Sequence, residues 1–228
     1  MSAGHDPRSV RHPDTPVEVL VCIAVREEVQ CFSPPAHPRT EVLVTGIGIQ
    51  RALQSIARYL GSHRPRLVLT CGFAGGLNPN HALGRVLFDD SAAGPFRGRF
   101  PSQEAQPGRF VHSDRVLTTA QEKADLFEST SGDAVEMESS AIVAACRERG
   151  IPVIMARVIS DTATEDLPMD FNRFSRPDGS LSMPRLLLGL AQSPSTIPKL
   201  IRFQSRLKYA AGNLAETLHH FLATDFLL

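Results

Sequence analysis

One stretch, residues 134–161 (AVEMESSAIVAACRERGIPVIMARVISD), constrains the fold most strongly. Its apolar residues predict a buried strand, a helix that ends at Gly150, and a second buried strand. A strand, a helix and a strand in series are typical of a mostly parallel sheet. Acidic residues stand where the strands end: Glu136 and Glu138 after the first, and Asp161 after the second. Their placement at the junction of sheet and loops needs an explanation.

The same alternation extends along the chain. Apolar runs predict strands, and a helical pattern that stops at Gly61 follows the second strand. The predicted strands lie within residues 17–25, 41–48, 64–76, 84–90 and 108–114; the second ends in a glycine turn, and the third runs into the glycine-rich loop Gly72–Gly76. Strands that alternate with helices indicate an α/β fold in which a mostly parallel sheet lies between helical layers.

Other segments predict loops and helices. Residues 91–108 are rich in Gly, Pro and Ser and predict an exposed loop. Thr119 and Glu122 form a T-x-x-E capping box, which predicts a helix of about two turns. Near the C-terminus, Pro184 and Pro198 mark expected helix starts, and the segment LAETLHHFL predicts a closing amphipathic helix.

Length and charge limit the class of protein. The 228 residues fit one domain, which we place at residues 17–228 after a disordered tail at residues 1–16. Lys+Arg and Asp+Glu are balanced at 24 each, and the chain has no Trp and two Tyr, so nucleic-acid binding is disfavoured. No apolar run approaches the ~20 residues of a transmembrane helix, and no secretory signal precedes the domain. A cytoplasmic protein is expected.

The cysteines and histidines do not predict a metal site. Cys22, Cys31, Cys71 and Cys146 are far apart and include no C-x-x-C pair, so structural thiols in a reducing compartment are favoured. The eight histidines show no ligand spacing. We expect neither a metal nor a cofactor.

Polar residues converge at one edge of the predicted sheet. In such folds the ligand lies beyond the carboxyl ends of the strands, where Glu28, the Gly72–Gly76 loop, Glu138 and Asp161 all fall. Alone, each has an ordinary structural explanation, as a helix-start acid, a helix N-cap or a turn. Together they suggest a site where one carboxylate binds a vicinal diol and another donates a proton to a leaving group.

Five motifs in order carry a family resemblance: AVREEV, TGIG, CGFAGGL, VEMES-A and RVISD. From about Val17 to Phe171 the chain resembles the purine nucleoside phosphorylase and nucleosidase superfamily, specifically its methylthioadenosine/S-adenosylhomocysteine nucleosidase-like branch. The resemblance implies a three-layer α/β/α fold with a central mixed, mostly parallel sheet. It also implies cleavage of an N-glycosidic bond.

The resemblance assigns roles to the acids. Glu28 matches the residue that orients the attacking water, and Glu138 matches the residue that binds the ribose hydroxyls, with Met137 against the sugar. Asp161 matches the aspartate that hydrogen-bonds the base at N7 and supports its protonation. Three carboxylates would then perform three tasks.

Further substrate-binding residues are implied in the same way. Arg157 and Ser160 match the motif around the aspartate and would support it and its loop, and Phe171 matches the aromatic residue that closes over the base. The glycine-rich segment would contribute Phe73, Ala74 and Gly75.

Two departures bear on the substrate. Phe73 stands where the nucleosidases have a serine, and the region between Asp90 and Arg109 is shorter than theirs. The C-terminal half is similar to the hopanoid-associated phosphorylase-like group, which is linked to removing adenine from adenosylhopane. An adenine nucleoside with a 5′ substituent is therefore the expected substrate, and its 5′ group stays open.

Hydrolysis is the predicted reaction, with two alternatives. A phosphate-dependent phosphorylase would need arginines for the anion, for which Arg26, Arg51 and Arg85 are candidates. A nucleoside-binding protein without catalysis is the second alternative. The resemblance also implies a homodimer, and contact with a membrane surface is expected only if the substrate is a lipid.

Overall fold

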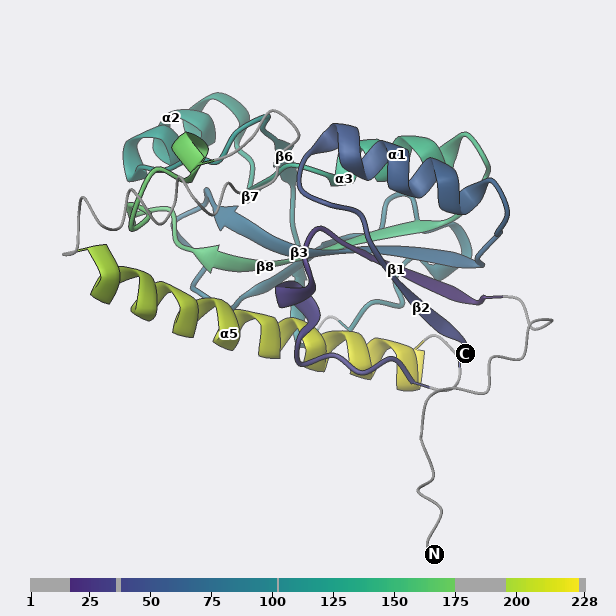
Figure 1. The fold of residues 1–228 in the computed structure, drawn as a ribbon. Helices are drawn as coiled ribbons and strands as arrows, with labels where there is room; N and C mark the ends of the chain where they lie inside the picture. The colour runs from purple at the N-terminus through teal and green to yellow at the C-terminus, as the bar shows by residue number, and fades with distance from the viewer. Residues whose placement is uncertain (1–16, 36–37, 102, 175–195, 226–228) are drawn as a thin grey trace, which may run out of the picture.

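A central eight-stranded sheet separates two layers of helices in the computed structural model of the chain (Figure 1). The structure describes residues 17–35, 38–101, 103–174 and 196–225. The predicted tail at residues 1–16 and the helix start at Pro184 lie outside these ranges. The strands are β1 (Val19–Ile23), β2 (Thr40–Val44), β3 (Leu67–Gly76), β4 (Val86–Asp89), β5 (Ala105–Pro107), β6 (Phe110–His112), β7 (Ala134–Glu136) and β8 (Val153–Asp161).

The sheet is mixed and mostly parallel, as predicted. Its main path runs β2-β1-β3-β8-β4-β5, while β7 joins β3 and β6. Parallel pairing links β1 to β2 and β3, β3 to β8, β4 to β5, and β6 to β7. The antiparallel pairs are β3 with β7 and β4 with β8.

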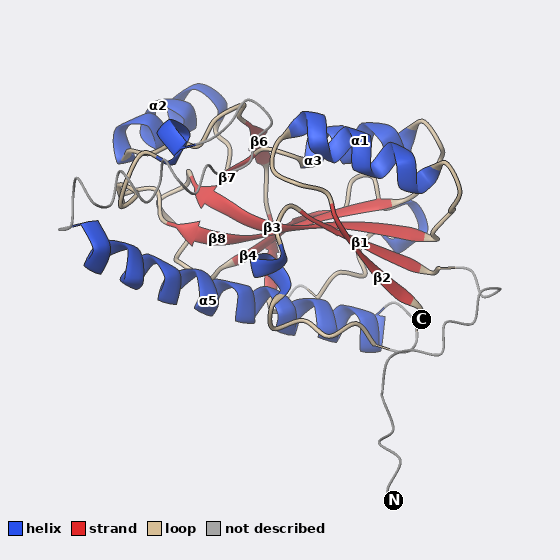
Figure 2. Ribbon diagram, in the orientation of Figure 1, coloured by secondary structure: helices blue, strands red, loops and turns tan. Residues whose placement is uncertain are grey.

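Helices cover both faces of the sheet (Figure 2). Helices α1 (Ile49–Leu60) and α3 (Ser139–Arg147) lie on one face, and α5 (Ile197–His220) lies across the other. Helix α2 (Ala120–Thr130) lies at the end of the sheet where β3 and β8 terminate. This arrangement is the three-layer α/β/α fold. None of the helices in the described ranges has the length and apolar content needed to cross a membrane.

The predicted helix signals have clear counterparts. Thr119 accepts a hydrogen bond from the N–H of Glu122, and the capping box is complete. The helix that follows has 11 residues, about three turns rather than the predicted two. Gly61 is the C-cap of α1, and Pro198 lies in the first turn of α5, where a helix start was expected.

Two predicted loops contain strands. The Gly72–Gly76 segment continues β3, because its backbone pairs with β8 and β7 on its two sides. Residues 91–108 include a 3-10 helix at Gly94–Phe96 and the short strand β5. The Gly, Pro and Ser residues of this segment disfavour a strand, so the sequence did not predict one. Strand β5 nevertheless forms, because three residues are enough to pair with β4 and extend the sheet.

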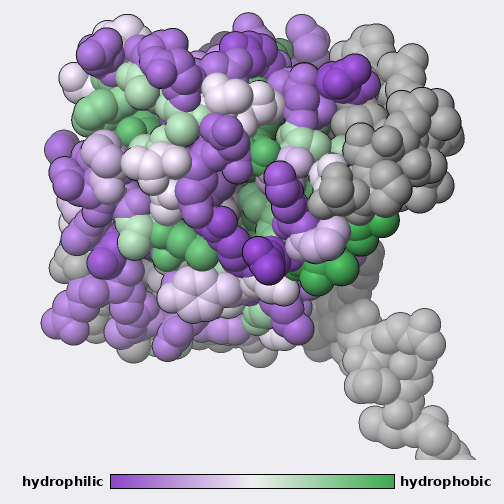
Figure 3. Space-filling view, turned by 90° about the vertical axis from the view of Figure 1, so that its left-hand side faces the viewer, coloured by the Kyte–Doolittle hydropathy of each residue, from purple (hydrophilic) through white to green (hydrophobic). Residues whose placement is uncertain are grey.

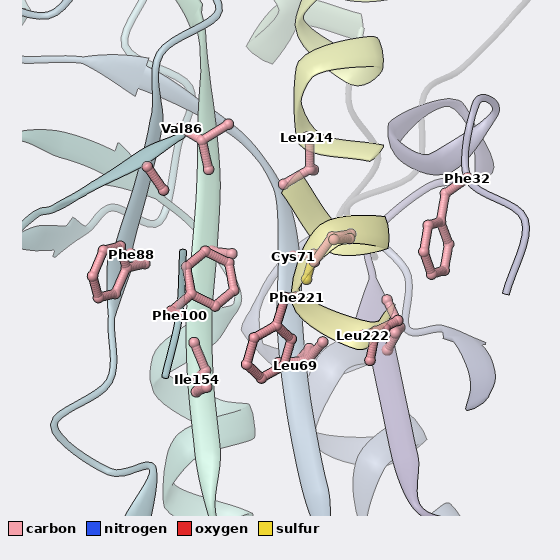
Figure 4. Close-up of a cluster of buried hydrophobic side chains, with 14 of the residues drawn as sticks. Phe32, Leu69, Cys71, Val86, Phe88, Phe100, Ile154, Leu214, Phe221 and Leu222 are labelled. Carbon is pink, nitrogen blue, oxygen red and sulfur yellow. The ribbon is translucent and has the colours of Figure 1, made fainter. Parts of the chain in front are cut away.

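The core forms a cluster on each face of the sheet. Figure 4 shows the cluster beneath α5, where Leu214 and Phe221 pack against strand residues such as Leu69 and Ile154. The alternate residues of the same strands, including Leu20, face α1 and α3. Burial on both faces explains why the strands are continuous apolar runs.

The cysteines are free thiols. Cys22, Cys71 and Cys146 are buried in the two core clusters, whereas Cys31 is exposed. Burial raises the pKa of Cys71 and Cys146 to about 12, so these thiols stay protonated at neutral pH. Their positions agree with a packing role.

Candidate active site

A cavity of about 590 Å³ opens at the carboxyl ends of β1, β3 and β8. This is where ligands bind in open parallel sheets. The predicted site residues that line it are Glu28, Phe73, Ala74, Gly75, Met137, Glu138, Ser160, Asp161 and Phe171. The remaining predicted residue, Arg157, lies beneath the cavity rather than in its wall.

Glu28 is held at one side of the cavity by backbone donors. It lies on a 3-10 helix directly after β1, and its Oε2 accepts hydrogen bonds from the N–H of Ala24 (2.7 Å) and Val25 (3.1 Å). Its Oε1 accepts from the N–H of Phe73 at 3.0 Å. Burial raises the pKa of Glu28 to about 7, although the charge of Arg157 and these donors act in the opposite direction. A carboxyl group that titrates near neutrality is suited to accept a proton.

A glycine makes room for Glu28. A Cβ added to Gly72 would lie 2.8 Å from Cδ of Glu28, closer than packed carbon atoms approach. Gly72 also has φ of 153°, which other residues rarely adopt. This close approach lets Glu28 reach the N–H of Phe73, the next residue of β3.

Asp161 is the last residue of β8, which pairs with β3 along the edge opposite β1, and both of its oxygens have side-chain partners. Ser160 donates its hydroxyl to Oδ1 at 2.7 Å. The ammonium group of Lys123, on α2, lies 2.5 Å from Oδ2. The predicted N-cap alternative for Asp161 therefore does not apply, since the residue ends a strand and faces the cavity.

Lys123 was not predicted as a site residue. Its side chain is fully buried, and its Nζ also donates to the backbone carbonyls of Thr162 and Glu165, both at 2.9 Å. A fully buried lysine is rare unless it is paired. The capping box at Thr119 predicted the helix that carries Lys123, but no sequence motif linked this residue to Asp161.

A second buried ion pair supports the floor of the site. Arg157 donates to Glu136 at 3.2 Å and to the hydroxyls of Ser139 at 2.6 Å and Thr70 at 3.1 Å. Burial alone would raise the pKa of Glu136, but the Arg157 charge and the N–H groups of Ser139 and Glu138 outweigh it and lower the pKa. Arg157 thus contacts Glu136, and not Asp161 as the resemblance implied.

Glu138 is fixed by the loop after β2. Its Oε1 accepts a hydrogen bond from the N–H of Gly48 at 2.8 Å, and Gly48 has φ of 87°, a left-handed conformation that favours glycine. Burial raises the pKa of Glu138, against the effect of the Gly48 donor and of Arg157. The TGIG motif therefore serves to position this carboxylate.

The rest of the cavity wall is largely apolar. Met137 and Phe171 line it, and the Phe171 ring lies 6.0 Å, between centroids, from the ring of Phe203 on α5. Asn172 connects this wall to the loop before α2 through hydrogen bonds with the N–H (2.9 Å) and carbonyl (2.8 Å) of Val116. Further apolar lining comes from Leu117, Leu167 and Leu207.

The arginines considered for phosphate do not reach the cavity. Arg26, Arg51 and Arg85 are absent from its wall. Arg115 is the arginine that lines it, and this residue donates to Glu122 at 2.7 Å. Within the described ranges, no group of three or more His, Cys, Asp or Glu residues is placed to hold a metal ion.

Comparisons with known proteins support the predicted resemblance. The family model described as Phosphorylase superfamily matches residues 103–190. A 5′-methylthioadenosine/S-adenosylhomocysteine nucleosidase from Helicobacter pylori is similar in structure, with a TM-score of 0.64 and 16% identity over 91% of this chain and 98% of that chain. The Colwellia psychrerythraea nucleosidase of the same name, in complex with adenine, has a TM-score of 0.61 and 18% identity over 92% and 96%.

Futalosine hydrolase from Helicobacter pylori is similar as well, with a TM-score of 0.62 and 16% identity over 91% of this chain and 98% of that chain. Both kinds of protein share the α/β/α architecture described above. The chain is thus similar to the phosphorylase superfamily over residues 103–190, and it shares the fold of these nucleosidases and of futalosine hydrolase, in agreement with the predicted resemblance.

Proposed function

We propose that the protein is a nucleosidase, which hydrolyses the N-glycosidic bond of an adenine nucleoside. The observation that carries the proposal is the presence of Glu28, Glu138 and Asp161 on one cavity, with the pKa of Glu28 raised to about 7. The names of the structurally similar proteins, nucleosidases and futalosine hydrolase, support the same class of reaction.

Glu28 is the proposed base for the attacking water. Its oxygens are fixed by three backbone N–H groups, so the side chain is positioned before a substrate arrives. With a pKa of about 7, a large share of Glu28 is ionised at neutral pH and able to take a proton from water.

Asp161 is the proposed proton donor to N7 of the base. The ammonium group of Lys123, whose Nζ lies 2.5 Å from Oδ2, is the proposed source of this proton, which passes through the Asp161 carboxyl group to N7 and leaves Lys123 neutral. As the C–N bond breaks, its electron pair moves to the base and N7 takes this proton. Water then forms the new C–O bond and loses a proton to Glu28. The transition state carries positive charge on the ribose, which the buried Glu138 carboxylate stabilises.

Water is favoured over phosphate as the nucleophile. A phosphate dianion needs several charge-assisted donors; the candidate arginines Arg26, Arg51 and Arg85 do not line the cavity, and Arg115, which does, is paired with Glu122. Phe73 adds apolar surface where a phosphate-binding hydroxyl would help. Both observations support hydrolysis.

The apolar side chains of the cavity wall suggest an apolar 5′ substituent. Phe171, Phe203 and Leu207 belong to this wall together with Leu117 and Leu167. Adenosylhopane, implied by the resemblance of the C-terminal half, is the substrate we propose to test first. We also propose a homodimer, the assembly that the resemblance to the nucleosidase family implies.

The test is to incubate the protein with adenosine, methylthioadenosine and adenosines with long 5′-alkyl groups, with and without phosphate. Released adenine and the mass of the sugar product are measured. We expect free 5′-substituted ribose without a need for phosphate, and faster release with apolar 5′ groups. A sugar 1-phosphate formed only with phosphate would identify a phosphorylase, and binding without adenine release would identify a nucleoside-binding protein. A preference for methylthioadenosine would rule out the proposed preference for long apolar 5′ substituents.

A further inference from the structure

The first half of α5 exposes an unusual set of side chains. Large apolar residues exposed in the described ranges are Val42, Val44, Leu53, Ile197, Ile201 and Tyr209. Half of these lie within the 13 residues from Ile197 to Tyr209. Scattered apolar side chains on a surface are normal, but their concentration on one helix suggests a contact surface.

The two isoleucines lie on one side of the helix. Ile197 is 43% exposed and Ile201 is 60% exposed, and residues four apart are neighbours along a helix. Each side chain therefore leaves much of its apolar area in water, where burial against another apolar phase would be favourable.

Positive charge accompanies them. Lys199, Arg202 and Lys208 are exposed on the same segment, and Arg206, half-buried, forms an ion pair with Glu165. From Ile197 to Ala215 the helix contains no Asp or Glu. The chain as a whole has a net charge of zero. This part of the helix is therefore positively charged in a protein that is neutral overall.

The same segment also borders the cavity. Phe203 and Leu207 line it from α5, while Ile197 and Ile201 are exposed and do not. Figure 3 views the end of the molecule where α5 begins, and there hydrophobic and hydrophilic surfaces lie directly side by side. An occupant of this surface would therefore lie on the same helix that contributes Phe203 and Leu207 to the cavity wall.

We propose that the first half of α5, the α5 face formed by Ile197, Lys199, Ile201, Arg202 and Lys208, docks on an anionic phospholipid membrane. Exposed isoleucines and cations on the same stretch of helix favour contact with an anionic bilayer, because the apolar groups can enter the acyl boundary while the cations meet the head groups. The long lysine and arginine chains extend toward the charged layer. This docking is independent of the proposed chemistry in the cavity.

The experiment measures co-sedimentation of the full chain with phosphatidylcholine vesicles, prepared with and without phosphatidylglycerol. We expect binding only with phosphatidylglycerol, and a loss of binding as salt is raised. Ile197→Ser/Ile201→Ser is expected to lower the partition coefficient about tenfold or more. Arg202→Gln is expected to lower it about fivefold at low salt.

Helix α1 offers matched controls, since it lies on the opposite face of the sheet. Leu53 is 45% exposed, and Arg58 is exposed on the same helix. Leu53→Ser and Arg58→Gln should leave vesicle binding unchanged. Adenine release from a water-soluble nucleoside should also be unchanged in the Ile197→Ser/Ile201→Ser variant, which separates a failure of docking from a failure of the proposed reaction.

Three results would overturn the proposal. The first is absence of wild-type binding to phosphatidylglycerol vesicles, and the second is equal loss of binding in the α1 and α5 variants. The third is a change from dimer to monomer in the Ile197→Ser/Ile201→Ser variant, seen by light scattering, without any vesicle binding. That outcome would assign the α5 face to a second copy of the chain.

Discussion

Glu28 and Asp161 are both buried carboxylates on one cavity, but backbone N–H groups hold the first and a lysine ammonium group holds the second. Neutral donors do not offset the burial of Glu28, and its pKa rises to about 7. Asp161 instead has a full positive charge at 2.5 Å. The two carboxylates thus differ in where a proton can come from: Glu28 can accept one from water, whereas a proton for the leaving group can reach Asp161 from the Lys123 ammonium group.

The largest expected effect comes from removing either carboxylate. Glu28→Gln and Asp161→Asn should each lower kcat by about 10²–10⁴, because general acid–base catalysis contributes this much. Adenine release from a substrate that the wild type cleaves is the measurement. If Glu28 and Asp161 have the proposed roles, both variants lose catalysis but still bind the nucleoside. Equilibrium dialysis can check the binding. A variant that keeps half of the wild-type activity would remove that residue from the mechanism.

The next largest effect is expected from removing Lys123, the partner of Asp161. Lys123→Met leaves Asp161 as a buried charge without its partner, which costs about 3–5 kcal/mol of unfolding free energy. Arg115→Met is the matched control, since its ion pair with Glu122 is exposed and such pairs contribute about 0–1 kcal/mol. Urea denaturation measures both values. Similar small losses in the two variants would contradict a tight Lys123–Asp161 pair.

Stability should also depend on Glu28 through pH. Because its pKa rises from 4.5 in the unfolded chain to about 7 in the fold, its contribution is complete below about pH 4.5 and is lost as pH rises through 7. A tenfold change in an acid dissociation constant corresponds to about 1.4 kcal/mol of free energy, so the loss across this range is about 3 kcal/mol. Unfolding free energies from about pH 5 to about pH 8 should fall more steeply for the wild type than for Glu28→Gln. Parallel curves would refute the raised pKa of Glu28.

The smallest of these effects concerns the space beside Glu28. Gly72→Ala places a Cβ 2.8 Å from Cδ of Glu28, so we expect the carboxylate to move and kcat to fall about tenfold or more. Gly212→Ala, where an added Cβ has no neighbour within 4 Å, is the control and should stabilise α5 by about 0.5–1 kcal/mol. Unchanged kinetics in Gly72→Ala would show that catalysis tolerates displacement of Glu28.

The outline of the fold was predictable because both faces of the sheet are covered. Burial on two sides makes β1, β3 and β8 nearly continuous apolar runs. The capping box at Thr119 predicts the start of α2. Short edge strands such as β5 carry no such signal. The continuation of β3 through Gly72–Gly76 was missed since glycines favour loops unless neighbouring strands satisfy their backbone groups.

The site was predictable where its residues follow a strand end in the sequence. Glu28, Glu138 and Asp161 follow that rule and line one cavity. Lys123 does not, because it comes from the middle of α2 and meets Asp161 only through tertiary packing. The ion pair between Arg157 and Glu136 also forms only through tertiary packing, so the sequence did not predict it.

The most direct test of the difference between the two sides is the pH dependence of kcat/KM in phosphate-free buffer. This ratio reports the ionisation of groups in the free enzyme. If Glu28 is the base for water, kcat/KM of the wild type rises through an apparent pKa of about 7, the value that burial gives to Glu28. A ratio that is constant across neutrality, or activity that appears only when phosphate is added, would contradict the account.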